Sequence, residues 1–292
     1  MSNQLEFRHI KYFLAVAEDL HFRKAADRLF ISQPGLSRQI KEMEDELGIM
    51  LFKRHNRKVE LTVAGRYLQS ELSKQLHTLE HIMEHAKHLH QGKDGSLKLG
   101  YVGSAMQHVI PDLLVKFRET HPNVIFGLKE MENDKQVEKL LSHELDLGFV
   151  RLERIPRGLQ SKVVLVEKFC LVLPKHHKMN TNNFQSLSKL KDESFILFDP
   201  EYSASYYEKV MQIFDDSGFS PMVSHNTVHA SSIFKLVENG FGISIVPESL
   251  QADYYPGIKF ITLEKITQRT VLSAVWDRSN SNPTLEQLLE FI

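Results

Sequence analysis

Apolar residues recur at helical spacing through the first part of the chain. The first set predicts a helix over residues 6–19 and consists of Phe7, Ile10, Phe13, Leu14 and Ala17. A second, short helix fits residues 23–29, where Ala25 and Ala26 allow close packing. Residues 30–32 then form a predicted tight turn, which leads directly into a third helix.

The third helix begins after Ser32, a good N-cap, and carries Pro34 in its first turn, where proline costs no hydrogen bond. Its apolar stripe consists of Leu36, Ile40, Met43 and Leu47, and Gly48 marks its end. The opposite face carries Ser37, Arg38 and Lys41. Two helices joined by a short turn, the second with polar residues at its start, are typical of a helix-turn-helix.

Residues 51–62 predict a small β-hairpin that follows the third helix. Phe52, Val59 and Leu61 can face inward. The tip is cationic and contains Lys53, Arg54, His55, Arg57 and Lys58. A cationic tip suits phosphates or a minor groove, so the hairpin is interpreted as a wing.

Residues 63–90 contain no proline and, after Gly65, no glycine, which predicts one long helix. Its heptad seam consists of Leu72, Leu76, Leu79, Met83 and Ala86, and an exposed seam of this kind needs a partner helix. Five histidines lie here, at positions 77, 81, 85, 88 and 90. They have a spacing that could ligate Zn²⁺ or Ni²⁺, but no cysteine is near, and the interpretation favoured is a solvated or dimer-flanking face without a metal.

From residue 96 onward, strand patterns alternate with helix patterns. This alternation predicts an α/β architecture with parallel strands, arranged in two halves. The last segments can return to the first half, with crossovers near residues 160–167 and 265–270. The polar segment 91–95, which carries two glycines, predicts a hinge before this region.

The chain has 292 residues, of which 42% are hydrophobic and 25% charged, as expected for a folded protein of two or three domains. A single cysteine excludes an internal disulfide and favours a reducing compartment. We find no secretory signal pattern and no run of 18 apolar residues, so we expect a cytoplasmic protein with no membrane partner.

The formal net charge of −1 is the sum of two unlike parts. Residues 1–66 hold 12 Lys and Arg against 9 Asp and Glu, a net charge of +3, and the remainder carries −4. By itself the basic excess is consistent with solvated faces. Because this basic excess lies on a helix-turn-helix and a wing, it indicates a surface that binds nucleic acid.

The run AADRLFISQPGLSRQIKEMEDELGIMLFKRHNRKVELTVAG resembles the winged helix-turn-helix of LysR-type transcriptional regulators. The resemblance implies a mainly α, N-terminal winged helix-turn-helix and a linker helix. An α/β effector domain of two subdomains, like a periplasmic binding protein, follows them. It also implies double-stranded DNA as a partner, a homodimer through the linker helix, a homotetramer, and a small-molecule effector. The residues implied to contact DNA are Ser32, Gln33, Pro34, Ser37, Arg38, Lys41, Arg54 and Arg57.

The resulting domain assignment is a DNA-binding domain over 1–66, a linker helix over 67–90, a hinge over 91–95 and an effector domain over 96–292. Subdomain I takes 96–161 and 268–292, and subdomain II takes 162–267.

Ligands in such folds bind at the carboxyl ends of strands and at helix N-termini between the halves. The candidate residues are Gly103, Ser104, Met131, Asn133, Phe149, Arg151, Pro200, Tyr202, His229, Ser231 and Pro247. Ser104 and Ser231 are equally explained as helix caps, and Arg151 as a surface partner of Glu153 or Glu132. An organic or aromatic acid is slightly favoured as effector, although Glu132 would repel it unless it faces away or is paired.

Two other classes of protein compete with a regulator. A solute-binding or sensing α/β protein with non-specific DNA affinity would explain the second part of the chain, and an architectural DNA binder would explain only the first. An enzyme is not expected, because the chain contains no Walker A, G-x-S-x-G or H-E-x-x-H sequence and no cofactor motif. Cys170 is interpreted as a small buried residue.

Overall fold

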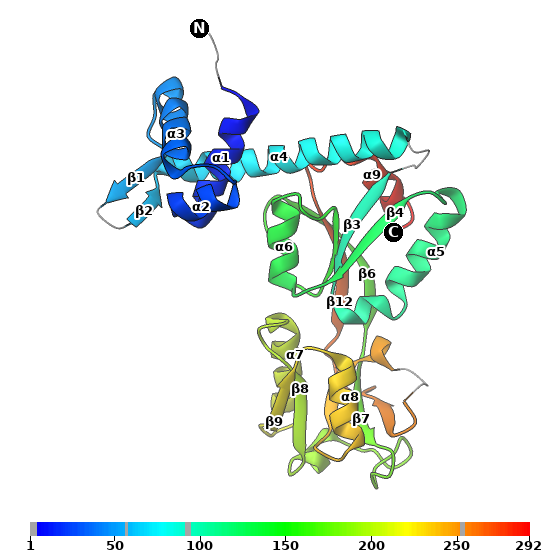
Figure 1. Cartoon of the computed structure of the whole chain (residues 1–292). Coiled ribbons are helices and arrows are strands. Elements are labelled where there is room, and N and C mark those ends of the chain that lie inside the picture. Colours follow the sequence, from blue (N-terminus) through cyan, green and yellow to red (C-terminus); the bar gives the residue numbers. More distant parts are fainter. Residues whose placement is uncertain (1–4, 56–57, 91–94, 252–254) are drawn as a thin grey trace. The chain divides into compact units, whose positions relative to one another are not determined.

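The computed structural model describes residues 5–55, 58–90, 95–251 and 255–292 (Figure 1). The chain divides into two compact units, Met1–His81 and Ile82–Ile292. The division falls inside the long helix α4 (Val63–His90), which was predicted as a linker. The predicted hinge lies outside the described residues except for Gly95.

The first unit is a winged helix-turn-helix, as the sequence predicted. Its elements before α4 are α1 (Phe7–Asp19), α2 (Phe22–Arg28), α3 (Gln33–Leu47), β1 (Phe52–His55) and β2 (Lys58–Leu61). The two strands form an antiparallel hairpin. One core holds the helices to the hairpin, and its fully buried members include Phe13, Ala25, Leu36, Ile40 and Phe52.

Local interactions set where α3 begins and ends. The Ser32 hydroxyl accepts the Gly35 N–H at 3.2 Å, which confirms the predicted cap. Gly48 ends the helix in the left-handed conformation, with φ of +68°. The buried Glu44 carboxylate accepts the N–H groups of Leu51 and Phe52, which fixes the wing against the helix.

Two of the cations near the chain start stabilise the packing of α1 on α2. Lys24 and Arg28 lie 2.9 and 3.0 Å from the Asp19 carboxylate, and Arg28 also contacts Glu18 at 2.6 Å. The hydrogen bond from Lys24 lowers the pKa of the Asp19 carboxyl, although burial opposes this. Part of the basic excess of this unit is therefore structural.

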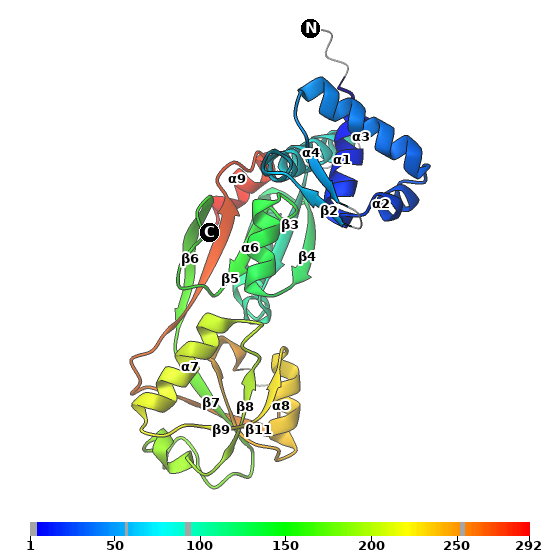
Figure 2. The ribbon, with the colours of Figure 1, turned by 90° about the vertical axis from the view of Figure 1, so that its left-hand side faces the viewer.

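The second unit consists of two lobes, and lobe I is built on a single sheet (Figure 2). Lobe I has the strand order β4-β3-β5-β12-β6. Its strands are β3 (Ser96–Tyr101), β4 (Ile125–Glu130), β5 (Leu147–Val150), β6 (Leu159–Glu167) and β12 (Thr270–Asp277). Successive residues of β5 pack on opposite faces of the sheet. Phe149 contacts the core under α5 (Val109–Thr120) and α9 (Pro283–Leu289). Val150 contacts the core under α6 (Asn133–Leu141) on the other face.

Lobe II contains two sheets, β10-β7-β11 and β8-β9, which an isolated bridge between Phe195 and Ile243 joins. Its strands are β7 (Phe169–Pro174), β8 (Ser194–Phe198), β9 (Met222–Thr227), β10 (Ser244–Pro247) and β11 (Ile258–Thr262). Phe169 and Leu171 of β7 pack toward α7 (Ala204–Asp216), whereas Cys170 and Val172 pack toward α8 (Ala230–Glu238). Short 3₁₀ turns lie at η1 (Gly103–Met106), η2 (Leu187–Leu190) and η3 (Glu248–Leu250).

The expectation of parallel strands is only partly right. β3 pairs in parallel with β4 and β5, and β8 with β9, but β12 is antiparallel to both β5 and β6. β10 and β11 are likewise antiparallel to β7. The reason is that β6 leaves lobe I and β12 returns to it, so the two strands run in opposite directions. β6 pairs with β12 along its whole length, so the chain changes lobes at Lys168, just beyond the predicted crossover.

Helix α4 leaves part of its predicted seam in solvent. Leu72 packs against the core of the first unit, whereas Leu79 and Met83 are 38% and 57% exposed. Within the described residues no cluster of histidine, cysteine or carboxylate side chains has metal-binding geometry. In the same part of the chain, no helix is long and apolar enough to cross a membrane.

Candidate functional site

The first candidate site is the start of α3. Ser32, Gln33 and Pro34 are exposed there, and the Arg38 side chain is 80% exposed. The Gln33 amide donates to the Ser37 hydroxyl at 2.9 Å. The Arg38 guanidinium contacts Glu42 at 2.8 Å, an exposed pair that a stronger acceptor can displace.

A groove beside this surface is lined by residues of α2, the start of α3 and β2, among them Arg23, Gln33 and Lys58. Lys41 is exposed one turn beyond Arg38. Arg54 lies on β1, and Arg57 lies outside the described residues. Exposed donors at a helix start, beside a groove that contains Arg23 and Lys58, can contact base edges and phosphates together.

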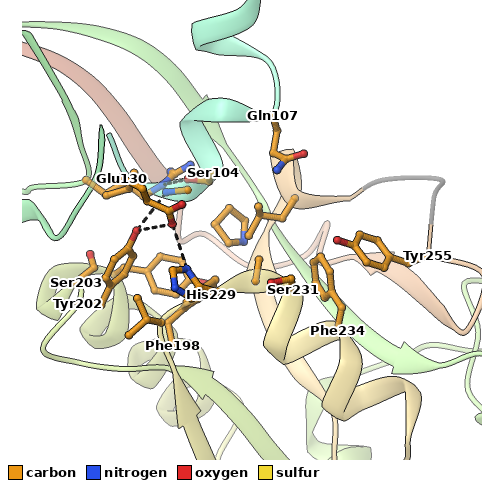
Figure 3. A pocket seen from close by; sticks show the side chains of 18 residues that line it. Ser104, Gln107, Glu130, Phe198, Tyr202, Ser203, His229, Ser231, Phe234 and Tyr255 are labelled. Carbon is orange, nitrogen blue, oxygen red and sulfur yellow. Dashed lines mark hydrogen bonds and ion pairs between the residues drawn. The ribbon is translucent and has the colours of Figure 1, made fainter. Parts of the chain in front are cut away.

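The second candidate site is a cavity of about 200 Å³ between the lobes of the second unit (Figure 3). Lobe I contributes Gly103 and Ser104 after β3, and Arg151 after β5. Lobe II contributes Tyr202 and the start of α8 with its exposed Ser231. Polar groups that converge from strand ends and a helix start can bind a small polar molecule.

Arg151 is the most heavily bonded side chain of the cavity, and it is only 5% exposed. Its Nε and Nη2 donate to the Ser104 hydroxyl at 3.1 and 3.0 Å, and its Nη1 donates to Thr270 at 2.8 Å. Its Nη2 also pairs with the buried Glu167 carboxylate. Glu167 in turn accepts the Ser249 hydroxyl of lobe II at 3.0 Å, so this network joins the two lobes.

Glu130, the last residue of β4, also lines the cavity from lobe I. Its Oε1 is 3.4 Å from the Tyr202 hydroxyl, which donates to it, and 3.4 Å from His229 Nδ1. The Tyr202 hydroxyl also accepts the Gly103 N–H at 3.2 Å. Burial, helped by the Glu130 charge, raises the pKa of Tyr202 to about 12, so this hydroxyl stays protonated.

The structure brings together seven of the residues proposed to bind an effector: Gly103, Ser104, Arg151, Tyr202, His229, Ser231 and Pro247. Ser104 and Ser231 are not helix caps, since Val102 and His229 occupy the cap positions. Arg151 pairs with Glu167 rather than with Glu153 or Glu132. Glu132 is paired with Lys135 at 3.1 Å.

Four of the proposed residues do not line the cavity. Phe149 is fully buried in the core of lobe I, and Met131 packs under α6. The Asn133 amide donates to the Arg151 carbonyl at 3.2 Å and to Ser203 of lobe II at 2.9 Å, and the second bond ties the lobes together. Pro200 is half-buried in the loop after β8.

Sequence reasoning did not identify several lining residues: Gln107, Glu130, Phe198, Phe234 and Tyr255. Part of the signal for Glu130 was present, because it directly precedes Met131, a candidate at the predicted end of the same strand. The aromatic residues gave no signal apart from ordinary apolar periodicity.

Cys170 is fully buried, as expected, and we predict that it is unreactive. Burial raises the pKa of this thiol to about 11, so almost no thiolate exists below pH 9. Iodoacetamide at pH 8 should therefore leave the folded protein unlabelled and label it fully in guanidinium chloride. Rapid labelling of the folded protein, followed by mass spectrometry, would contradict this assignment.

Comparison with known families matches almost the whole chain. Residues 7–66 match the family model described as a bacterial regulatory helix-turn-helix protein of the lysR family. Residues 90–292 match the LysR substrate binding domain.

Relatives and solved structures agree with these matches. The uncharacterized HTH-type transcriptional regulator YnfL of Escherichia coli is 33% identical over 93% of this chain and 91% of its own. AlsR of Bacillus subtilis, another HTH-type transcriptional regulator, is 30% identical over 98% of this chain and 94% of its own. Full-length CbnR in complex with its target DNA is 27% identical, covers 99% of both chains and superimposes with a TM-score of 0.70.

Proposed function

We propose, because the chain belongs to the LysR family of bacterial transcriptional regulators, that the start of α3 reads operator DNA and that the inter-lobe cavity binds the controlling effector. The chain is a sequence-specific DNA-binding regulator whose activity a small molecule modulates. The observation that carries the cavity assignment is the convergence of strand ends, a helix start and buried polar groups from both lobes on one small space.

The DNA-binding proposal assigns a role to each exposed group. Arg38 can donate a bidentate pair to guanine, and Gln33 can pair with adenine, once their contacts with Glu42 and Ser37 are exchanged. Pro34, Ser37 and Lys41 lie beside them, and Ser32 both caps α3 and can reach a phosphate. Arg54 and Arg57 of the wing are proposed to contact phosphates or the minor groove.

Dimerisation through α4 explains how one small module binds tightly enough. A single winged helix-turn-helix buries little surface, whereas two modules read two half-sites. The exposed Leu79 and Met83 supply an apolar face for a second copy of the helix. A dimer of dimers and action in the cytoplasm, where bacterial DNA lies, complete the proposal.

The effector is proposed to act by closing the two lobes over itself. It can shift the equilibrium between the open and closed arrangements of the lobes only by as much as its affinities for the two arrangements differ. Ser104, Arg151, Glu167 and Ser249 form a continuous bonded path from the cavity wall to the other lobe, so a ligand at this wall changes how the lobes meet. The proposal assigns binding, and no catalytic step, to the cavity.

The test is to fill the cavity with a side chain. Ser231→Trp should abolish the rise in melting temperature that a ligand from a metabolite screen gives the wild type, and leave DNA affinity in the absence of ligand unchanged. Ser188→Trp, at an exposed position outside the cavity, is the control and should keep the ligand effect. A ligand that still stabilises Ser231→Trp binds elsewhere, and would refute the cavity assignment.

A further inference from the structure

The charge of the cavity determines which effectors it accepts. Its one arginine, Arg151, is already neutralised by Glu167, and its donors are bonded to Ser104 and Thr270. Among the described lining residues, no other arginine and no lysine is present. The remaining charged groups are Glu130 and, when protonated, His229.

Glu130 is held in place facing the cavity (Figure 3). The Tyr202 hydroxyl and His229 Nδ1 lie on either side of its Oε1. Gly103 makes the room, because a Cβ at that position would be 2.8 Å from the same oxygen. The Glu130 side chain keeps 34% of its surface exposed, so a ligand can reach the carboxylate.

Aromatic rings form much of the remaining wall. Phe198 and Tyr202 stand beside Glu130, and Phe234 and Tyr255 stand across the cavity near Ser231 (Figure 3). Ring faces attract cations and pack against flat apolar groups. A carboxylate and five phenylalanine and tyrosine side chains, Tyr206 included, around a space of about 200 Å³ are suited to a small cation with an apolar body.

We propose that the effector is an organic cation, whose protonated nitrogen pairs with Glu130 and whose flat body packs against Phe198, Phe234 and Tyr255. This inference rests on the proposed function of the cavity and replaces the organic acid that the resemblance favoured. An acid with its carboxylate beside Glu130 would meet a like charge, and an acid at Arg151 would have to displace Glu167. Both arrangements bring two carboxylates together without a free cation between them.

Matched probes of one shape and three charges test the proposal. The full chain is titrated calorimetrically at pH 8 with benzylamine, benzyl alcohol and benzoate, and with tryptamine, tryptophol and indole-3-propionate. An imidazole is ordinarily neutral at this pH and an alkyl amine still charged. In at least one set we expect the amine to bind at least tenfold more tightly than its carboxylate. Glu130→Gln should weaken that amine about tenfold and leave the alcohol unchanged.

Glu132→Gln is the matched control, because it makes the same change two residues away on a side chain that pairs with Lys135 outside the cavity. It should keep the preference for amines. The proposal is overturned if in neither set the amine binds more tightly than its carboxylate, if no amine binds, or if Glu130→Gln leaves amine affinity unchanged. If a carboxylate binds to the wild type and Ser231→Trp abolishes this binding, only the preference for cations is rejected. If a ligand still binds to Ser231→Trp, the proposed function of the cavity is itself rejected.

Discussion

Replacing Arg151 by methionine is expected to destabilise the second unit by about 3–5 kcal/mol, because it leaves the Glu167 carboxylate buried without its cation. For a unit of this size each kcal/mol corresponds to roughly 2–4 °C, so its melting temperature should fall by about 6–20 °C. Differential scanning calorimetry of the full chain measures the shift.

Two variants separate the buried pair from the simple loss of an arginine. Arg154→Met removes an exposed arginine three residues away and should change the melting temperature by no more than about 2 °C. The double variant Arg151→Met with Glu167→Met removes both charges and should recover most of the loss. A double variant no more stable than Arg151→Met would show that the ion pair is not the cause.

Removing the Arg38 guanidinium is expected to cost about 1–3 kcal/mol of specific DNA binding, which is roughly a 5- to 150-fold loss of affinity. The side chain is 80% exposed at the start of α3, and within the described residues its hydrogen bond is to the exposed Glu42. Its loss should therefore leave the fold intact. Fluorescence anisotropy with the cognate operator measures the change for Arg38→Ala.

Arg38→Lys keeps the charge but cannot donate in a bidentate fork, and it should recover only part of the affinity. Arg118→Ala, an exposed arginine on α5, makes the same truncation in the second unit and should bind DNA as the wild type does. Equal affinity of Arg38→Ala and the wild type for the operator would remove Arg38 from the proposed interface.

The helix-turn-helix was predictable because its signals are local. The Ser32 cap, the Gly48 stop and the buried stripe of Leu36 and Ile40 all act within one helix or turn. The direction of β12 was not predictable in this way, because it depends on where the chain returns from lobe II. β11 gave no clear pattern, and its place beside β7 is set by the fold of the whole lobe.

The residues of the candidate cavity were likewise predictable only where local structure determines their position. Strand ends pointed to Ser104 and Arg151, and a helix start pointed to Ser231, since these are fixed by local structure. The partner of Arg151 was missed because Glu167 lies 16 residues further along the chain, at the end of β6 in the same sheet. Glu132 drew attention in place of Glu130 because alternation cannot decide where a strand stops, and β4 ends at residue 130.

The most direct measurement of the central claim is DNase footprinting of the purified protein on a genomic fragment that it selects, with and without a ligand that binds the cavity. We expect protection of two half-sites, a change in the extent of protection when ligand is added, and loss of the pattern in Arg38→Ala. Uniform protection along the fragment, or a footprint that the bound ligand leaves unchanged, would contradict it.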